Sequence, residues 1–286
     1  MKLIAIDLDG TLLADDGTIS MENVRSIREV QDKGHVVSIA TGRSLQDTKE
    51  ILRRSNLDCP IIVGNGARSF HHGIDLHQLY LKTDVAKELI SFLRDLEVYF
   101  EMYTNDGILL EKHMETILRK ELPNVSKDIP VSLDQLIAIQ RGQHGLQIVD
   151  DYETVCSSYE GVYKVFVLSL LSKKRDQLKN WIDSRKDISI TSSGREKLEI
   201  AHHRASKGYA LELLAKHFNI PMKNTVAIGD NFNDLSMFRV AGISISMGNA
   251  EDEVKQETTY TTKNYDQHGV AYALRTYVLD DAVVKK

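Results

Sequence analysis

The stretch Leu3-Ile4-Ala5-Ile6-Asp7-Leu8-Asp9-Gly10-Thr11 decides how the rest of the chain is interpreted. Four apolar residues, followed shortly by a glycine that permits a sharp turn, are typical of a buried strand that runs into a loop. Open α/β sheets bind their ligands at such carboxyl ends of strands. Asp7 and Asp9 lie two residues apart in an extended segment, so we expect their side chains to point to the same side.

Two carboxylates held this close repel each other, so the pair requires a cation or a shared proton. Mg²⁺ suits a site built from carboxylate, main-chain carbonyl and water oxygens. Two other interpretations are open at this point: a solvated turn between a strand and a helix, and the opening of a calcium loop.

The composition is that of an ordinary globular protein. Of 286 residues, 42% are hydrophobic and 27% are charged, and the net charge is −5. No basic block points to nucleic acid, and no apolar run approaches membrane-spanning length. We therefore expect a cytoplasmic protein with no nucleic-acid or membrane partner, and we favour a monomer. Cys59 and Cys156 are far apart and lack metal-binding spacing, which favours buried, reduced thiols.

Strand and helix patterns alternate in the first and last parts of the chain, which predicts a parallel sheet with right-handed crossovers. The middle mixes helical patterns with alternating β-rich segments, which favours an α+β unit with an antiparallel sheet. We predict a discontinuous core domain of residues 1–82 and 194–286, with a second domain of residues 83–193 inserted into it. The expected core elements are strands at 3–6, 35–40, 61–63, 225–228 and 242–246, and helices at about 20–33, 45–54 and 209–218.

Two more strand ends carry polar side chains. Thr41-Gly42-Arg43-Ser44 offers a hydroxyl, a glycine and a helix amino terminus, which together favour an anion site; a plain helix cap is the alternative. In Gly229-Asp230-Asn231-Phe232-Asn233-Asp234, Asp230 is the best further metal ligand, and Asp234 is either a ligand or a residue that orients a bound water. Lys207, at the start of a helix, is either a solvated charge or a clamp for phosphate.

In this order, the motifs resemble the four signatures of the haloacid dehalogenase (HAD) superfamily: Asp7-Leu8-Asp9-Gly10-Thr11, Thr41-Gly42-Arg43, Lys207-Gly208 and Gly229-Asp230-Asn231-Phe232-Asn233-Asp234. Asn65-Gly66-Ala67, Gly248-Asn249-Ala250 and Gly269-Val270 look like those of its Cof-type phosphatases, which carry a large αβ cap after the second signature. The resemblance covers the whole chain apart from the middle of the inserted domain. One helix and one strand separate the first two signatures, which leaves no room for a cap there and disfavours β-phosphoglucomutase-like relatives.

The resemblance implies a Rossmann-like parallel-sheet core with an inserted α+β cap domain, and a Mg²⁺-dependent phosphatase chemistry. Asp7 would attack phosphorus and form an aspartyl-phosphate, and Asp9 would first donate and then accept a proton. Mg²⁺ would be held by the Asp7 carboxylate, the Asp9 main-chain carbonyl and Asp230. The other phosphate oxygens would be bound by the Thr41 hydroxyl, the N–H groups of Leu8 and Gly42, Lys207 and Asn233.

An aspartate at position 9 favours a phosphatase or phosphomutase over the ion pumps of the superfamily, which carry threonine there. We expect small phosphorylated metabolites as substrates, sugar phosphates first and nucleotide or cofactor monophosphates next. A phosphohexomutase is the nearest alternative, and a non-catalytic phosphosugar-binding regulator is the second. His202-His203-Arg204 departs from the Pro-x-Gly usual in relatives, and it forms either a cationic rim or an exposed loop.

Overall fold

A computed structural model describes residues 1–124, 132–152 and 161–280 of the chain. Contacts between Cα atoms divide the chain into two compact units. The first unit contains Met1–Arg43, Thr48–Gln78 and Ala205–Lys286, and the second contains Ser44–Asp47 and Leu79–Arg204. Cys59 is a buried free thiol, as expected, whereas Cys156 lies outside the described residues.

The first unit is built on a sheet with the strand order β14-β13-β12-β1-β2-β3-β4-β5. All neighbours from β14 to β3 pair in parallel, and an antiparallel hairpin, β4 and β5, extends one edge. The strands are β1 (Leu3–Ile6), β2 (Val36–Ala40), β3 (Ile61–Val63), β4 (Arg68–His71), β5 (Ile74–Gln78), β12 (Thr225–Gly229), β13 (Ile243–Ser246) and β14 (Tyr260–Thr261). Because β12, β1 and β2 are neighbours, the three motif-bearing strand ends lie side by side.

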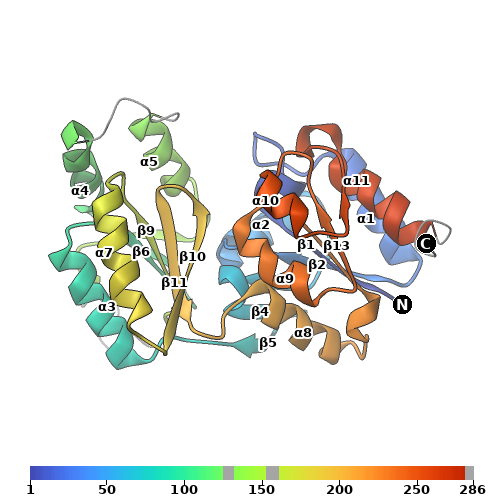
Figure 1. The fold of residues 1–286 in the computed structure, drawn as a ribbon, viewed down its shortest axis with the longest axis horizontal. Helices are drawn as coiled ribbons and strands as arrows, with labels where there is room; N and C mark the ends of the chain where they lie inside the picture. The colour runs from blue at the N-terminus through green and yellow to red at the C-terminus, as the bar shows by residue number, and fades with distance from the viewer. Residues whose placement is uncertain (125–131, 153–160, 281–286) are drawn as a thin grey trace. The chain divides into compact units, whose positions relative to one another are not determined.

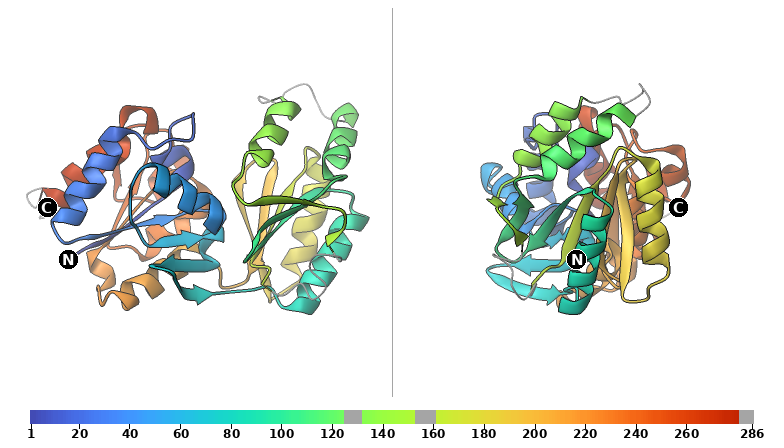
Figure 2. Two further views of the ribbon diagram at one scale, coloured as in Figure 1. Left: turned by 180° about the vertical axis from the view of Figure 1, so that it is seen from behind. Right: turned by 90° about the vertical axis from the view of Figure 1, so that its left-hand side faces the viewer.

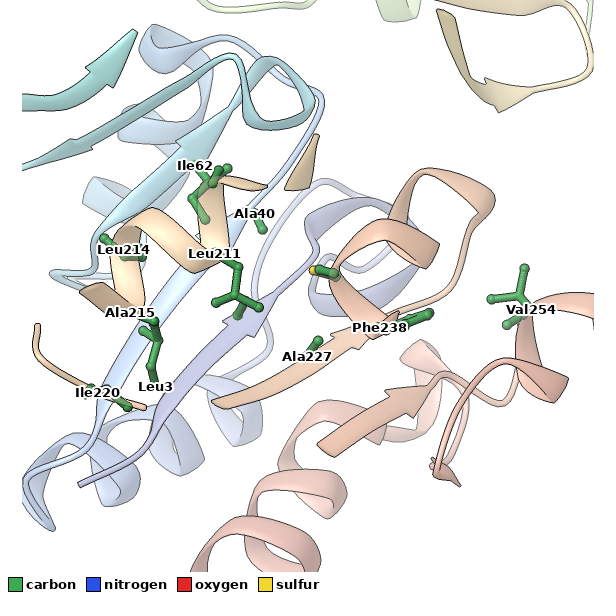
Figure 3. Packing of buried hydrophobic residues seen from close by; sticks show 14 residues of the cluster. Leu3, Ala40, Ile62, Leu211, Leu214, Ala215, Ile220, Ala227, Phe238 and Val254 are labelled. Carbon is green, nitrogen blue, oxygen red and sulfur yellow. The ribbon is translucent and has the colours of Figure 1, made fainter. Parts of the chain in front are cut away.

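Helices cover both faces of this sheet (Figure 1). They are α1 (Met21–Asp32), α2 (Leu45–Arg54), α8 (Lys207–His217), α9 (Leu235–Val240), α10 (Asp252–Gln256) and α11 (Gly269–Ala273). Figure 3 shows the buried cluster in which Leu3 and Ala227 of the sheet pack with Leu211 of α8 and Phe238 of α9. Since side chains alternate along a strand, Ile4 and Ile6 point to the opposite face, and both are fully buried. Burial on both faces explains the unbroken apolar run of β1.

Local signals in the sequence set the ends of these elements. The Ser20 side chain accepts a hydrogen bond from Asn23 N and so caps α1, as its position before the helical pattern predicts. The helix ends at Asp32, and Gly34 follows with a φ of 78°. The expected core strands and helices are therefore confirmed to within one or two residues. The sequence also favours a hairpin tip at His71-His72, and β4 and β5 meet there; strand β14 was not predicted.

The second unit contains a sheet with the order β10-β11-β9-β6-β7-β8. Its described elements are α3 (Thr83–Asp95), β6 (Tyr99–Thr104), β7 (Gly107–Glu111), α4 (Met114–Glu121), α5 (Leu133–Arg141), β8 (Leu146–Val149), β9 (Lys164–Leu168), α7 (Ser172–Asp183), β10 (Ile188–Gly194) and β11 (Lys197–His202). Helices α3 and α7 lie side by side along one face of the sheet (Figures 1 and 2), and Phe92 stacks on Trp181 between them, with ring centroids 4.8 Å apart. The fold class, a Rossmann-like parallel-sheet core with an α+β insertion, is confirmed.

The second sheet differs from the expected one in two respects. Strands β7 and β8 pair in parallel, so the sheet is mixed rather than purely antiparallel. Strands β10 and β11 form a hairpin in which Thr191 pairs with Glu199, so the predicted boundary at 193/194 falls within one hairpin. The contacts place the return to the first unit at Ala205 instead.

Among the described residues, no helix is both long enough and apolar enough to cross a membrane.

Candidate active site

Asp7 sits where β1 leaves the sheet. Its N–H still donates to the Ile228 carbonyl of β12 at 2.9 Å, so the last hydrogen bond of the parallel ladder fixes its backbone. Its side chain lies in a buried position, with the residue 5% exposed. The chain then turns at Gly10, which has a φ of 75°, and a Cβ there would lie 2.3 Å from Asp230 Oδ2. A glycine is therefore required both by the backbone conformation and by the closeness of Asp230.

Lys207 joins two of the predicted carboxylates. Its Nζ donates to Asp7 Oδ1 and to Asp234 Oδ1, each at 2.6 Å, and the residue is completely buried. It is the first residue of α8, and Ser206 caps this helix by accepting from Tyr209 N. The alternative of a solvated lysine is therefore wrong.

Asp234 uses both of its carboxylate oxygens within the protein. Oδ1 accepts from Lys207, and Oδ2 accepts from the backbone N–H groups of Asp230 and Asn231 at 2.9 and 3.0 Å. Asp230 in turn accepts from the Thr11 hydroxyl at 2.9 Å. Asp234 thus holds the loop after β12 in shape, which leaves Asp230 and Asp7 better placed to bind a cation.

The cluster contains more negative than positive charge. Carboxylate oxygens of Asp7, Asp230 and Asp234 all lie within 4.8 Å of one another, with Lys207 as the ammonium group between two of them. Burial raises the pKa of Asp7 well above its usual value; Lys207 opposes this shift, and the neighbouring carboxylates add to it. Burial and Asp234 raise the pKa of Asp230 to about 6. A hard divalent cation would offset this excess charge, and the all-oxygen donors suit Mg²⁺.

The pKa of Lys207 reflects the same balance. Burial by itself would lower it, but Asp234 and Asp7 raise it above the usual lysine value. The side chain is therefore a permanent cation at neutral pH, held at the base of the site.

Thr41 follows β2 and is completely buried. Its N–H donates to the Ile62 carbonyl at 2.9 Å, and its hydroxyl oxygen accepts from Arg43 N at 3.1 Å, so the hydroxyl proton can still be donated elsewhere. The Arg43 side chain makes two hydrogen bonds to the Asp9 carboxylate, at 2.9 and 2.6 Å.

The loop after β3 supports the site from a third side. Asn65, in a left-handed conformation with a φ of 54°, accepts a hydrogen bond from Asn233 Nδ2 at 3.2 Å. A Cβ on Gly66 would lie 2.0 Å from the Ser206 carbonyl, so this loop packs directly against the residue before Lys207. His77 contacts the Gly66 carbonyl through Nε2 at 2.9 Å.

Direct hydrogen bonds connect Asp7, Lys207, Asp234 and Asp230 into one network, and Asp9 lies on the same loop as Asp7. The other predicted binding residues, Leu8, Thr41, Gly42 and Asn233, occupy the adjoining strand ends. His202 and His203 belong to the second unit, where they line a pocket with Lys82 and Arg185.

Several residues of the site had no role assigned from the sequence. Thr11, Arg43 and Asn65 lie within the quoted motifs, so the motifs could have indicated that these residues belong to the site. Asn249 is another: its side chain donates to the Gly10 carbonyl at 2.9 Å and accepts from Tyr265 N at 3.1 Å. No role was assigned to His77, although the hairpin tip expected at His71-His72 places it on the returning strand β5.

Fold and site together define a class: an α/β enzyme that handles an anionic substrate at the carboxyl edge of a parallel sheet. The family profile of haloacid dehalogenase-like hydrolases matches residues 4–274. The chain belongs to this family, and its prediction as a Cof-type HAD phosphatase is confirmed.

Curated relatives of the chain are named phosphatases. It is 39% identical to the 5-amino-6-(5-phospho-D-ribitylamino)uracil phosphatase YwtE of Bacillus subtilis (strain 168), over 95% of this chain and 96% of that protein. It is 32% identical to the phosphatase YwpJ of the same strain, over 96% and 99% of the two chains. The solved structure of a haloacid dehalogenase-like hydrolase from B. subtilis has 31% identity and a TM-score of 0.86, covering 97% of this chain and 100% of that one.

Proposed function

We propose that this protein is a Mg²⁺-dependent phosphatase of small phosphorylated metabolites that forms an aspartyl-phosphate on Asp7. The observation that carries the proposal is the buried Lys207 between Asp7 and Asp234. A phosphate monoester and a carboxylate nucleophile are both anionic, so alignment and charge neutralisation are the main demands of the reaction. Lys207 meets both demands, because it orients the Asp7 carboxylate and places a cation beside it.

The reaction then has two steps. In the first, an Asp7 oxygen attacks phosphorus, the ester P–O bond breaks, and Asp9 gives its proton to the departing alkoxide. In the second, Asp9 takes a proton from a water molecule that attacks phosphorus, and the bond between phosphorus and Asp7 breaks. Inorganic phosphate leaves, and both aspartates return to their starting states.

The donor set supports Mg²⁺ as the cofactor. The Asp7 side chain, the Asp9 main-chain carbonyl and Asp230 would hold the ion, while Asp234 keeps Lys207 and the loop in place. When bound, the ion would neutralise charge on the nucleophile and on a phosphoryl oxygen.

The remaining phosphate oxygens would be bound by hydrogen-bond donors at the strand ends. These are the Thr41 hydroxyl, the N–H groups of Leu8 and Gly42, the Lys207 ammonium and the Asn233 amide. Removing one such donor typically costs about 2.7–4 kcal/mol of transition-state stabilisation.

We propose that the second unit acts as a cap that excludes water and selects the substrate. Sugar phosphates remain the first expectation, with nucleotide and cofactor monophosphates next. The name of the YwtE relative supports a small phosphorylated metabolite in general, because its substrate joins a uracil ring to a phosphorylated ribityl group and so has features of both classes. Cytoplasmic location and a monomeric state stay predictions of the sequence.

The test is phosphate release from a panel of monoesters, with Mg²⁺ and with EDTA. The panel holds glucose 6-phosphate, AMP, pyridoxal 5′-phosphate and 5-amino-6-(5-phospho-D-ribitylamino)uracil. We expect release only with Mg²⁺, and none above background from Asp7→Asn. Substantial activity in that variant would disprove the nucleophile, and binding of a monoester without release would favour a regulator. Conversion of glucose 1-phosphate to glucose 6-phosphate without free phosphate would favour a mutase.

A further inference from the structure

Asp9, the proposed proton donor, is much more exposed than the rest of the site. Its side chain is 59% exposed, whereas Asp7 is buried. The Asp9 backbone is extended, with a φ of −76° and a ψ of 124°, and Gly10 follows it. Packing therefore restricts the direction of this carboxylate little, although a proton donor must be aligned with the leaving oxygen.

The Arg43 guanidinium restrains this carboxylate directly. Its Nε donates to Asp9 Oδ2 at 2.9 Å and its Nη2 donates to Asp9 Oδ1 at 2.6 Å. Two parallel N–H···O bonds from a planar fork fix the orientation of a carboxylate as well as its distance.

Arg43 is itself held at both of its backbone polar groups. Its N–H donates to Thr41 Oγ1 at 3.1 Å, and its carbonyl accepts from Gly64 N at 3.1 Å. The fork therefore projects from a backbone tied to the ends of β2 and β3, not from a free loop. Its side chain is 30% exposed, about half the exposed fraction of Asp9.

We propose that Arg43 is a positioning residue that aims the Asp9 carboxyl group at the leaving-group oxygen. This inference rests on the proposed function. The fork can act in both protonation states of Asp9. An ionised carboxylate accepts both N–H groups, and a protonated one still accepts through its carbonyl oxygen while the hydroxyl faces the leaving group. Arg43 takes no part in bond making, so its effect is exerted through Asp9.

The test compares leaving groups. A nitrophenolate leaves as a stable anion and needs little proton donation, whereas an alkoxide needs a full proton. We would measure kcat/KM, which covers the first phosphoryl transfer, for 4-nitrophenyl phosphate and for an alkyl monoester of the panel. Asp9→Asn should lose roughly 10²–10⁴-fold on the alkyl ester, the usual contribution of a general acid, and much less on the nitrophenyl ester.

Arg43→Met should show the same selectivity at a smaller size, roughly ten-fold on the alkyl ester, because Asp9 remains but is no longer aimed. Arg43→Lys should fall between Met and wild type, since a lysine keeps the charge without the fork. The double variant Asp9→Asn with Arg43→Met should be no worse on the alkyl ester than Asp9→Asn alone. Arg53→Lys is the matched control, because Arg53 also makes a two-bond pair, with Glu50, at the exposed end of α2.

Equal losses of Arg43→Met on both esters would overturn the inference, since they would indicate a contact with phosphate or a folding defect. Additive losses in the double variant would overturn it as well, and so would an unchanged alkyl activity. Failure of the proposed function looks different: the wild type would release no phosphate from the panel, or Asp9→Asn would show no dependence on the leaving group.

Discussion

The substitution Lys207→Met tests whether the site is held together by charge. Methionine has a similar length and keeps the packing, but it removes an ammonium group that makes two bonds of 2.6 Å to buried carboxylates. Removing one partner of a buried ion pair typically costs about 3–5 kcal/mol, because the other charge is left uncompensated. For a unit of this size we expect Tm to fall on the order of 10 °C.

Thermal unfolding in EDTA, followed by circular dichroism, measures this effect without a bound metal. Lys216→Met is the matched control, since it places the same substitution at an exposed position of the same helix, and it should leave Tm within a degree or two. Adding Asp7→Asn to Lys207→Met removes one of the two stranded charges and should restore roughly half of the lost stability.

The reasoning would be refuted if Lys207→Met were as stable as the control. It would also be refuted if the double variant were no more stable than Lys207→Met alone, because the loss would then come from packing. Phosphate release should be lost in Lys207→Met and in the double variant whichever result is obtained. The Tm values, and not the activities, therefore decide between lost charge balance and lost packing.

Two further predictions concern the loops around the cluster. Gly10→Ala should lower kcat/KM at least ten-fold, because its methyl group would lie 2.3 Å from Asp230 Oδ2. Gly17→Ala is the control, because Gly17 has nearly the same φ, +74°, and a Cβ there would have no atom within 4 Å. An equal loss of kcat/KM in Gly17→Ala would mean that backbone strain, and not the contact with Asp230, causes the effect. Burial lowers the pKa of His77 in the folded protein below the value of about 6.5 that a histidine has in the unfolded chain. The stability that neutral His77 contributes is therefore complete above about pH 6.5 and is lost as the pH falls toward the pKa of the folded state. Between pH 7 and pH 5, Tm should therefore fall further in the wild type than in His77→Gln, and parallel curves would contradict this.

The strands and helices that position the site could be predicted because their signals are local. An apolar run that ends in Asp7 or Asp230, or a serine before the helical pattern of α1, involves neighbouring residues only. The alternation of strands and helices then predicts that β12, β1 and β2 are parallel, whereas the pairing of β12 with β1 is known from the structure. Strand β8 gave a weaker signal, because it is short and half exposed at a sheet edge, and its parallel pairing with β7 depends on tertiary context.

The contacts inside the site could not be predicted to the same extent. Lys207 and Asp7 are 200 residues apart, and nothing local to either shows that a single ammonium group bridges two carboxylates. The sequence left the role of Asp234 open between a metal ligand and a residue that orients a bound water. Its hydrogen bonds from the backbone N–H groups of Asp230 and Asn231 depend on the shape of the loop, which no local pattern indicates.

The residues that depart from the expected Pro-x-Gly pattern, His202 to Arg204, end at the point where the chain returns to the first unit. Ala205 is buried, Ser206 caps α8, and the Ser206 carbonyl packs against Gly66. These anchors all lie within the first unit and fix the path of the chain immediately before Lys207. The position of the lysine on which the charge balance of the site depends is therefore set by contacts of the first unit itself.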